Sequence, residues 1–148
     1  MMKRREPGIW EHALCRVQGL LFELAWQKGY DMRDFIDKFM TSATAAGLDE
    51  SYNPLQWAGE AYILEELESE CKINRQCRCR RTGSDALYWA GYLYRYWHYY
   101  TGESSVKMYR MAGYDAMVMC YPGYHTLACE VAIDWLREES NKRLMLCA

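Results

Sequence analysis

A chain of 148 residues has room for one ordinary domain that buries about two-thirds of its unfolded surface. Its hydrophobic fraction of 51% and charged fraction of 26% are those of a globular protein and exclude a disordered one. The net charge of -2 excludes a generally basic nucleic-acid binder but leaves room for one local basic patch. The 13 Tyr, 6 Trp and 9 Met, against 3 Phe, favour adaptable contact surface as well as core.

The sequence contains no apolar run of about 18 residues and begins without the pattern of a secretory signal peptide. We therefore expect a cytoplasmic protein with no membrane partner. Its seven cysteines, an odd number in a chain of this length, argue against a disulfide framework. Cys15, Cys120 and Cys129 lie in apolar surroundings and are expected to be reduced core residues.

Apolar residues at three- and four-residue spacing predict a first helix over residues 8–28, which Gly29 ends. A capping aspartate begins a second helix, which continues to Gly47. After a short polar link, an Asn-Pro pair begins a third helix over residues 54–70. The last turns of this third helix are rich in glutamate, which the helix dipole disfavours, so a basic neighbour would stabilise them.

The segment 72–83, KINRQCRCRRTG, has no apolar period and predicts a mobile loop. It separates the acidic third helix from residues 84–101, SDALYWAGYLYRYWHYYT, which predict an aromatic helix ended by Gly102. Aromatic side chains fall on two adjacent stripes of that helix. A helix that is apolar nearly all round is normally central, with neighbours on several sides.

Three further helices are expected over residues 104–111, over 114–121 before a Pro-Gly break, and from Thr126 into a charged tail. No strand pattern or internal repeat is evident. The sequence therefore predicts a single all-α domain over residues 1–148, an irregular bundle of five to seven helices around the aromatic helix.

Three cysteines, Cys71, Cys77 and Cys79, give a C-x5-C-x-C spacing that offers three thiolates to a metal, with His98 or a distant cysteine as the fourth ligand. The second pair that structural zinc sites usually carry is missing, so we predict no metal and no other cofactor. Nearby arginines would lower the thiol pKa values, which makes a redox-sensitive pair an alternative. Exposed thiols without a function are the simplest interpretation.

The same segment carries cations that would contact phosphates in a nucleic-acid-binding regulator: Lys72, Arg75, Arg78, Arg80 and Arg81. The adjoining aromatic side chains would stack on bases. Pairing with the neighbouring acidic helix explains the cations more simply, so we place nucleic acid second to a protein partner.

No serine-hydrolase, zinc-protease, P-loop or dinucleotide motif is found, which favours a non-enzymatic protein over an enzyme. Tyrosine, tryptophan and arginine dominate binding hot spots. We therefore predict a protein-binding module, with a homodimer as an alternative. The expected contact residues are Tyr94, Arg95, His98, Tyr99 and Tyr109.

Three stretches, residues 20–40, 56–68 and 88–109, resemble small all-helical bacterial proteins, some of which are antitoxin-like partners encoded beside toxin genes. The similarity runs from about Trp10 to Trp135 and leaves out the basic cysteine segment. It consists of aromatic helix patterns, not of catalytic signatures. The resemblance implies an antitoxin-like or inhibitory partner of another bacterial or phage protein.

Overall fold

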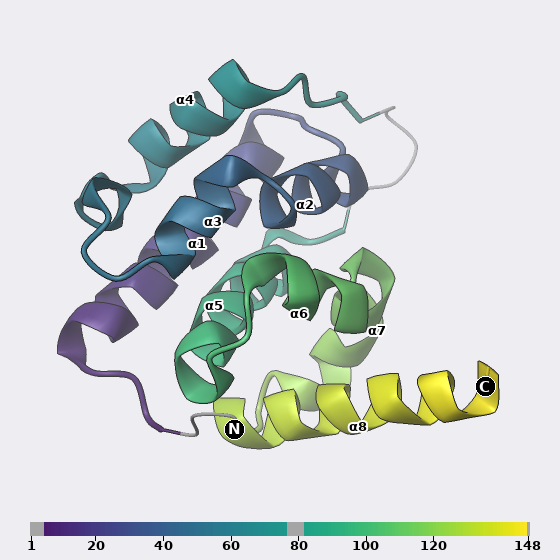
Figure 1. Ribbon diagram of the computed structural model, residues 1–148. Helices are drawn as coiled ribbons and strands as arrows, with labels where there is room; N and C mark the ends of the chain where they lie inside the picture. Colours follow the sequence, from purple (N-terminus) through teal and green to yellow (C-terminus); the bar gives the residue numbers. More distant parts are fainter. Residues whose placement is uncertain (1–4, 77–81, 148) are drawn as a thin grey trace.

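The computed structural model describes residues 5–76 and 82–147, which form eight α-helices and one turn of 3-10 helix (Figure 1). In chain order these are α1 (Ile9–Gln27), α2 (Met32–Met40), α3 (Ala43–Asp49), the 3-10 turn η1 (Pro54–Trp57), α4 (Glu60–Glu70), α5 (Ser84–Thr101), α6 (Ser105–Met111), α7 (Tyr114–Tyr124) and α8 (Cys129–Cys147). Within those ranges the only β-type pairing is an isolated bridge between Tyr30 and Arg75. The all-α class is confirmed, and the described helices outnumber the five to seven predicted.

Two glycines set the closest helix pair, α1 against α5. A Cβ atom on Gly91 would lie 2.5 Å from the carbonyl oxygen of Gln18, and one on Gly19 would lie 2.8 Å from the ring of Tyr88. The Gln18 side-chain amide donates to the carbonyl oxygen of Gly91 at 2.9 Å. The two backbones therefore approach to a distance that side chains at these positions would prevent.

The aromatic helix α5 packs against α1, α6, α7 and α8. The helices α4, α1, α5 and α8 follow one another across the molecule, and α2, α3, α6 and α7 fill the remaining side (Figure 1). The centre also holds three phenylalanines of α1 and α2, because the rings of Phe35 and Phe39 both meet Phe22 edge-on. None of the described helices is long and apolar enough to cross a membrane.

The second predicted helix is two helices, because the chain turns at Thr41 and Ser42. The Ser42 hydroxyl accepts a hydrogen bond from the Ala45 amide at 3.0 Å and begins α3. Ala43, which follows the capping serine, is exposed. A local serine cap outweighs the continuing apolar period here.

The third predicted helix is also divided. Gly59 has a φ of 80°, which separates η1 from α4 and changes the helical phase. Tyr62 is 51% exposed, and the buried face of α4 consists of Ile63, Leu64 and Leu67. Near the other end of the chain, Pro122 lies inside α7, where we had expected a break.

The acidic end of α4 does find partners. The Glu68 carboxylate accepts from Lys28 at 2.9 Å, as the unfavourable dipole led us to expect. Glu70 does something that the sequence did not suggest, because its carboxylate accepts from the backbone amides of Ala43 at 2.7 Å and Thr44 at 3.0 Å. It therefore caps the beginning of α3 from the end of α4.

The first part of the basic segment is held against the turn between α1 and α2. The amide of Asp31 donates to the carbonyl of Asn74 at 2.8 Å, and Gln76 donates to Gly29 at 3.0 Å. The Arg75 guanidinium bonds the Lys28 carbonyl and lies 5.1 Å from the centre of the Tyr30 ring. Residues 72–76 are therefore anchored and not the free loop that we predicted.

Candidate functional site

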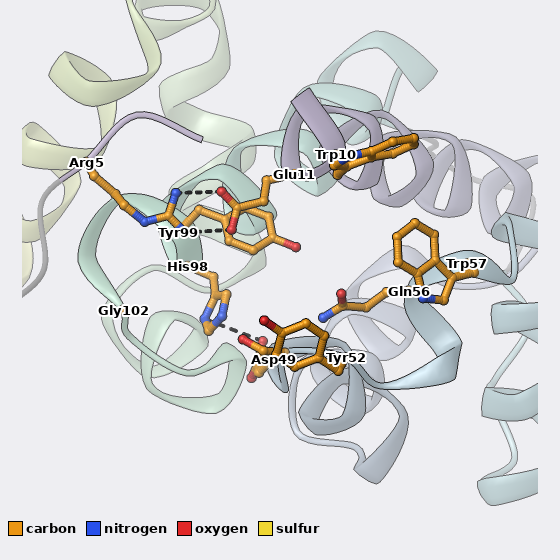
Figure 2. Close-up of a pocket in the computed structure, with 11 residues that line it drawn as sticks. Arg5, Trp10, Glu11, Asp49, Tyr52, Gln56, Trp57, His98, Tyr99 and Gly102 are labelled. Carbon is orange, nitrogen blue, oxygen red and sulfur yellow. Dashed lines mark hydrogen bonds and ion pairs between the residues drawn. The ribbon is translucent and has the colours of Figure 1, made fainter. Parts of the chain in front are cut away.

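A cavity of about 400 Å³ opens where the beginning of α1, the link between α3 and α4, and the end of α5 come together (Figure 2). Trp10 of α1, Trp57 of η1 and Tyr52 of the link stand at its edge, and we call these three side chains the aromatic rim. They are 73%, 67% and 91% exposed, respectively. Large aromatic side chains gathered this openly mark an interaction surface more often than a defect of packing.

The two indoles of the rim support each other. Their ring centroids lie 5.9 Å apart at an angle of 71°, an edge-to-face contact between the first turn of α1 and the end of η1. This geometry contributes about 0.5–1.5 kcal/mol beyond the area that the rings cover. Each ring therefore has a defined orientation although most of its surface faces water.

Tyr52 is held in a strained backbone conformation. Its φ of 68° makes it the one residue other than glycine with a positive φ in the described ranges. A bulky side chain in this left-handed region costs about 1–2 kcal/mol. Such strain persists where the surrounding structure imposes it and is concentrated at functional sites.

An ion pair forms one wall of the cavity. The Arg5 guanidinium binds the Glu11 carboxylate through two bonds of 2.5 and 2.6 Å, and Glu11 also accepts from the Gly8 amide at 2.9 Å (Figure 2). The bonds from Arg5 lower the pKa of Glu11, which keeps it ionised at neutral pH. The pair fixes the N-terminal segment beside the start of α1.

A second ion pair lies at the bottom of the site. Arg95 is fully buried, and its guanidinium donates to the Asp49 carboxylate at 2.8 Å and to the Gln18 side chain at 2.9 Å. Asp49 also accepts from the amide and the hydroxyl of Ser105, both at 2.8 Å. Both charges of this pair are therefore compensated, and the network ties α1, α3, α5 and α6 together.

His98 lies between this network and the cavity. Its Nδ1 is 2.7 Å from the Glu103 carbonyl oxygen and 3.7 Å from the Asp49 carboxylate (Figure 2). Burial lowers the pKa of His98, and the Arg95 charge lowers it further, against the opposing effect of Asp49. The imidazole is consequently neutral at pH 7, and with two balanced ion pairs the cavity offers no excess charge.

The hydroxyl of Tyr99 has no protein partner within residues 5–76 and 82–147. The side chain is only 9% exposed, lines the cavity, and points toward Gln56 (Figure 2). Burial raises its pKa to about 12, so the hydroxyl stays protonated and can donate as well as accept. Since a buried tyrosine hydroxyl usually finds a partner, this one is available to a group that enters the cavity.

The contact residues predicted from the sequence are therefore divided. Arg95, His98 and Tyr99 come together beside the cavity, but Arg95 and Tyr94 are 0% exposed and offer no surface to a partner. Tyr94 instead donates to the Ala112 carbonyl at 2.5 Å inside the core. Tyr109 is half-buried on α6 and does not line the cavity. Of the five predicted contact residues, Tyr94 and Arg95 therefore belong to the core.

The structure describes only part of the basic cysteine segment. Cys77, Arg78, Cys79, Arg80 and Arg81 lie outside the described residues. Among its described members Lys72 is exposed, and Arg75 is engaged with the α1–α2 turn. Burial raises the pKa of Cys71, against the thiolate character expected of a redox-sensitive site. Within residues 5–76 and 82–147, no three His, Cys, Asp or Glu side chains are grouped to hold a metal ion.

The aromatic rim was missed in the sequence. Trp10 continues the apolar period of the first predicted helix, a pattern that indicates a buried position. Trp57 fell at a predicted helix interior, which the 3-10 turn and Gly59 interrupt. The sequence carried no clear signal that Trp10 would be exposed, because it continues the apolar period.

No family model matches this chain, and neither a curated protein nor a solved structure matches it. The resemblance to antitoxin-like proteins is accordingly a prediction from residue patterns alone.

Proposed function

We propose that this chain is a non-enzymatic protein-binding module, an antitoxin-like or inhibitory partner, that docks another protein on the aromatic rim. The observation that carries this proposal is the edge-to-face pair of Trp10 and Trp57, both more than 60% exposed beside a preformed cavity. Tryptophan and tyrosine are the residues most enriched in binding hot spots.

The rim is suited to binding because its side chains are already ordered. The indoles brace each other, and the strained backbone of Tyr52 keeps the third ring at the edge of the cavity. A partner that covers these rings buries apolar surface worth about 25 cal/mol per Å². It does so without ordering flexible side chains, which costs about 0.5–1.5 kcal/mol for each one immobilised.

The cavity behind the rim supports a specific contact and not only a sticky one. The Arg5–Glu11 ion pair forms one wall of the cavity, and the Asp49–Arg95 ion pair lies at its bottom. The Tyr99 hydroxyl, in contrast, lacks a partner in the described part of the chain. A polar side chain of the partner would hydrogen bond this hydroxyl. Rejection of partners that leave the hydroxyl unpaired then gives selectivity.

The test begins with crosslinking of the tagged protein to its binding partner in host lysate, followed by affinity measurements with the purified pair. We expect Trp10→Ala and Trp57→Ala each to weaken binding by about 30-fold or more, the effect of losing a hot-spot residue. Trp135→Ala is the matched control, since Trp135 is 45% exposed on α8 and does not line the cavity.

Equal affinities for the wild type and both rim variants would contradict the proposed docking surface. Sedimentation of the isolated protein separates self-association from binding of a different protein. A dimer that Trp57→Ala dissociates would move the proposal to a homodimer interface, because the same rim would then face its own copy.

A further inference from the structure

A second cavity, of about 600 Å³, is lined by residues of α1, α5, α7 and the beginning of α8. Its volume falls in the range of about 300–1,000 Å³ that is typical of small-ligand sites. Four aromatic side chains line it, which we call the cage: Tyr88, Trp89, Tyr92 and Tyr121. The cage shares no residue with the aromatic rim.

Contacts among the rings give the cage a defined shape. Tyr88 and Tyr92, one turn apart on α5, have ring centroids 6.3 Å apart at 30°, and Trp89 meets Tyr121 of α7 edge-on at 5.7 Å. The Tyr121 ring is itself stacked on His125 at 4.6 Å. The cavity is therefore walled by aromatic rings from two helices.

The charges at this cavity have one sign. Glu23 of α1 and Asp85 of α5 line it, and no lysine or arginine of the described ranges does. Within residues 5–76 and 82–147 neither carboxylate makes a hydrogen bond or an ion pair. Burial raises the pKa of Cys129, which also lines the cavity, to about 11, so its thiol adds no charge at neutral pH.

One cation lies nearby. Burial raises the pKa of Tyr92 to about 12, and the charge of Arg16 on α1 opposes this shift to a smaller extent. Arg16 is exposed and does not line the cavity, whereas Glu23 and Asp85 do.

We propose that the cage binds a small organic ammonium ion. Trp89 and the tyrosines of the cage contact the alkyl groups of this ion, and the carboxylates of Glu23 and Asp85 balance its charge. Aromatic faces attract cations, and an alkylated ammonium also gains from burying its carbon atoms. A metal ion is a poor occupant, because aromatic rings cannot replace the oxygen ligands that it would have to give up. Free ammonium metabolites and trimethyl-lysine side chains share this chemistry, and we commit to the free ion.

The experiment uses choline and its uncharged carbon analogue, 3,3-dimethyl-1-butanol, as probes in calorimetric titrations of the intact protein. We expect choline to bind at least about tenfold more tightly than the alcohol, which fits a cation–π contribution of that size. A third probe, the amide of N-acetyl-trimethyl-lysine, distinguishes a free ammonium metabolite from a trimethyl-lysine side chain. If the natural ligand is the free ion, this amide should bind no better than choline.

Glu23→Gln combined with Asp85→Asn should reduce choline affinity by about tenfold while the fold is retained, because both carboxylates are partnerless and at least partly exposed. Glu65→Gln, an exposed acid of α4, is the charge control. Trp89→Leu should also weaken choline, and thermal unfolding monitors its stability. Trp57→Ala should leave choline binding unchanged, which separates this site from the aromatic rim.

Equal affinity for choline and the alcohol would overturn the proposal, as would failure of both to bind. Retention of choline affinity in the Glu23→Gln, Asp85→Asn protein would do the same. Tighter binding of the trimethyl-lysine amide by about tenfold would keep the ammonium chemistry but assign it to a protein side chain.

Discussion

Asp49 and Arg95 form a buried ion pair of 2.8 Å that lies directly beneath the candidate site. The guanidinium is completely buried, so its charge is tolerable only while the carboxylate faces it. Asp49 stands at the last position of α3, where the chain leaves for the segment that carries Tyr52. The same carboxylate therefore neutralises the core and anchors the base of the aromatic rim.

Removal of Asp49 should be severe. We expect Asp49→Ala to lower the free energy of unfolding by about 3–5 kcal/mol, because Arg95 would be left charged and unpaired in the core. Glu50→Ala changes the next residue, which is exposed, and should cost less than about 0.5 kcal/mol. Urea denaturation of both proteins makes the comparison, and a similar small loss in both would contradict the role of the pair.

The close approach of α1 and α5 predicts an asymmetry between two glycines. Gly91→Ala should destabilise the protein by about 1–3 kcal/mol, since the new Cβ would collide with the Gln18 carbonyl, which is backbone and cannot turn aside. Gly123→Ala is the matched change in α7, where nothing lies within 4 Å of the new atom. That variant should be more stable by about 0.5–1 kcal/mol, as for an exposed helical glycine. Thermal melts with opposite shifts would support the packing described, whereas a harmless Gly91→Ala would contradict it.

Relief of the strain at Tyr52 should separate stability from binding. Asparagine tolerates a positive φ better than tyrosine, so we expect Tyr52→Asn to raise the free energy of unfolding by up to about 1 kcal/mol. The same substitution removes a ring of the aromatic rim and should weaken the binding of the protein partner. Tyr62→Asn, at a half-exposed helical position of α4, should instead lose about 0.5 kcal/mol. Denaturation curves showing the same sign for both would rule out backbone strain as the cause.

The environment of Glu103 predicts that the protein loses part of its folding stability at acid pH. Burial alone would raise the pKa of Glu103, but bonds from Trp97 at 2.7 Å and Arg137 at 2.9 Å outweigh it and hold the pKa below 4.5. A pKa that is depressed by folding contributes stability above the unfolded value and loses it as the pH falls through the folded value. We expect Glu103→Gln to lose about 2 kcal/mol at pH 7, as for a bond to a charged group.

The measurement is the free energy of unfolding from pH 7 to pH 3. The gap between Glu103→Gln and the wild type should narrow below about pH 4.5, because the wild-type carboxylate is then protonated as well. A gap that stays constant over this range would show that the ionised form of Glu103 contributes nothing.

The helical class was predictable because it depends on periodicity and on caps within one segment. The Ser42 and Gly59 interruptions were not predicted, since each is a local choice of the backbone within an otherwise continuous apolar pattern. The prediction that Tyr94 and Arg95 of α5 contact a partner did not anticipate that both side chains are buried, and the reason is different. Their burial depends on Ala112 and Asp49, partners that are distant in the sequence and have no periodic relation to them.

The site could be predicted only in part for the same reason. His98 and Tyr99 were identified from the aromatic helix, whereas Trp10 and Trp57 come from segments whose meeting depends on how α1 and the α3–α4 link pack. Side-chain type suggested binding, but exposure decides which aromatics serve it. Exposure is a property of the assembled fold.

The hydrogen bonds that the amides of Ala43 and Thr44 donate to the Glu70 carboxylate close the open end of the α3–α4 helical hairpin, opposite the link that carries Tyr52 and Trp57. Helix α3 has only seven residues and is too short to persist alone, so its first turn exists when α4 is docked. The link is thus ordered as the hairpin folds. The link that carries Tyr52 and Trp57 loses its conformational entropy when the protein folds. Binding of a partner therefore does not have to order this link.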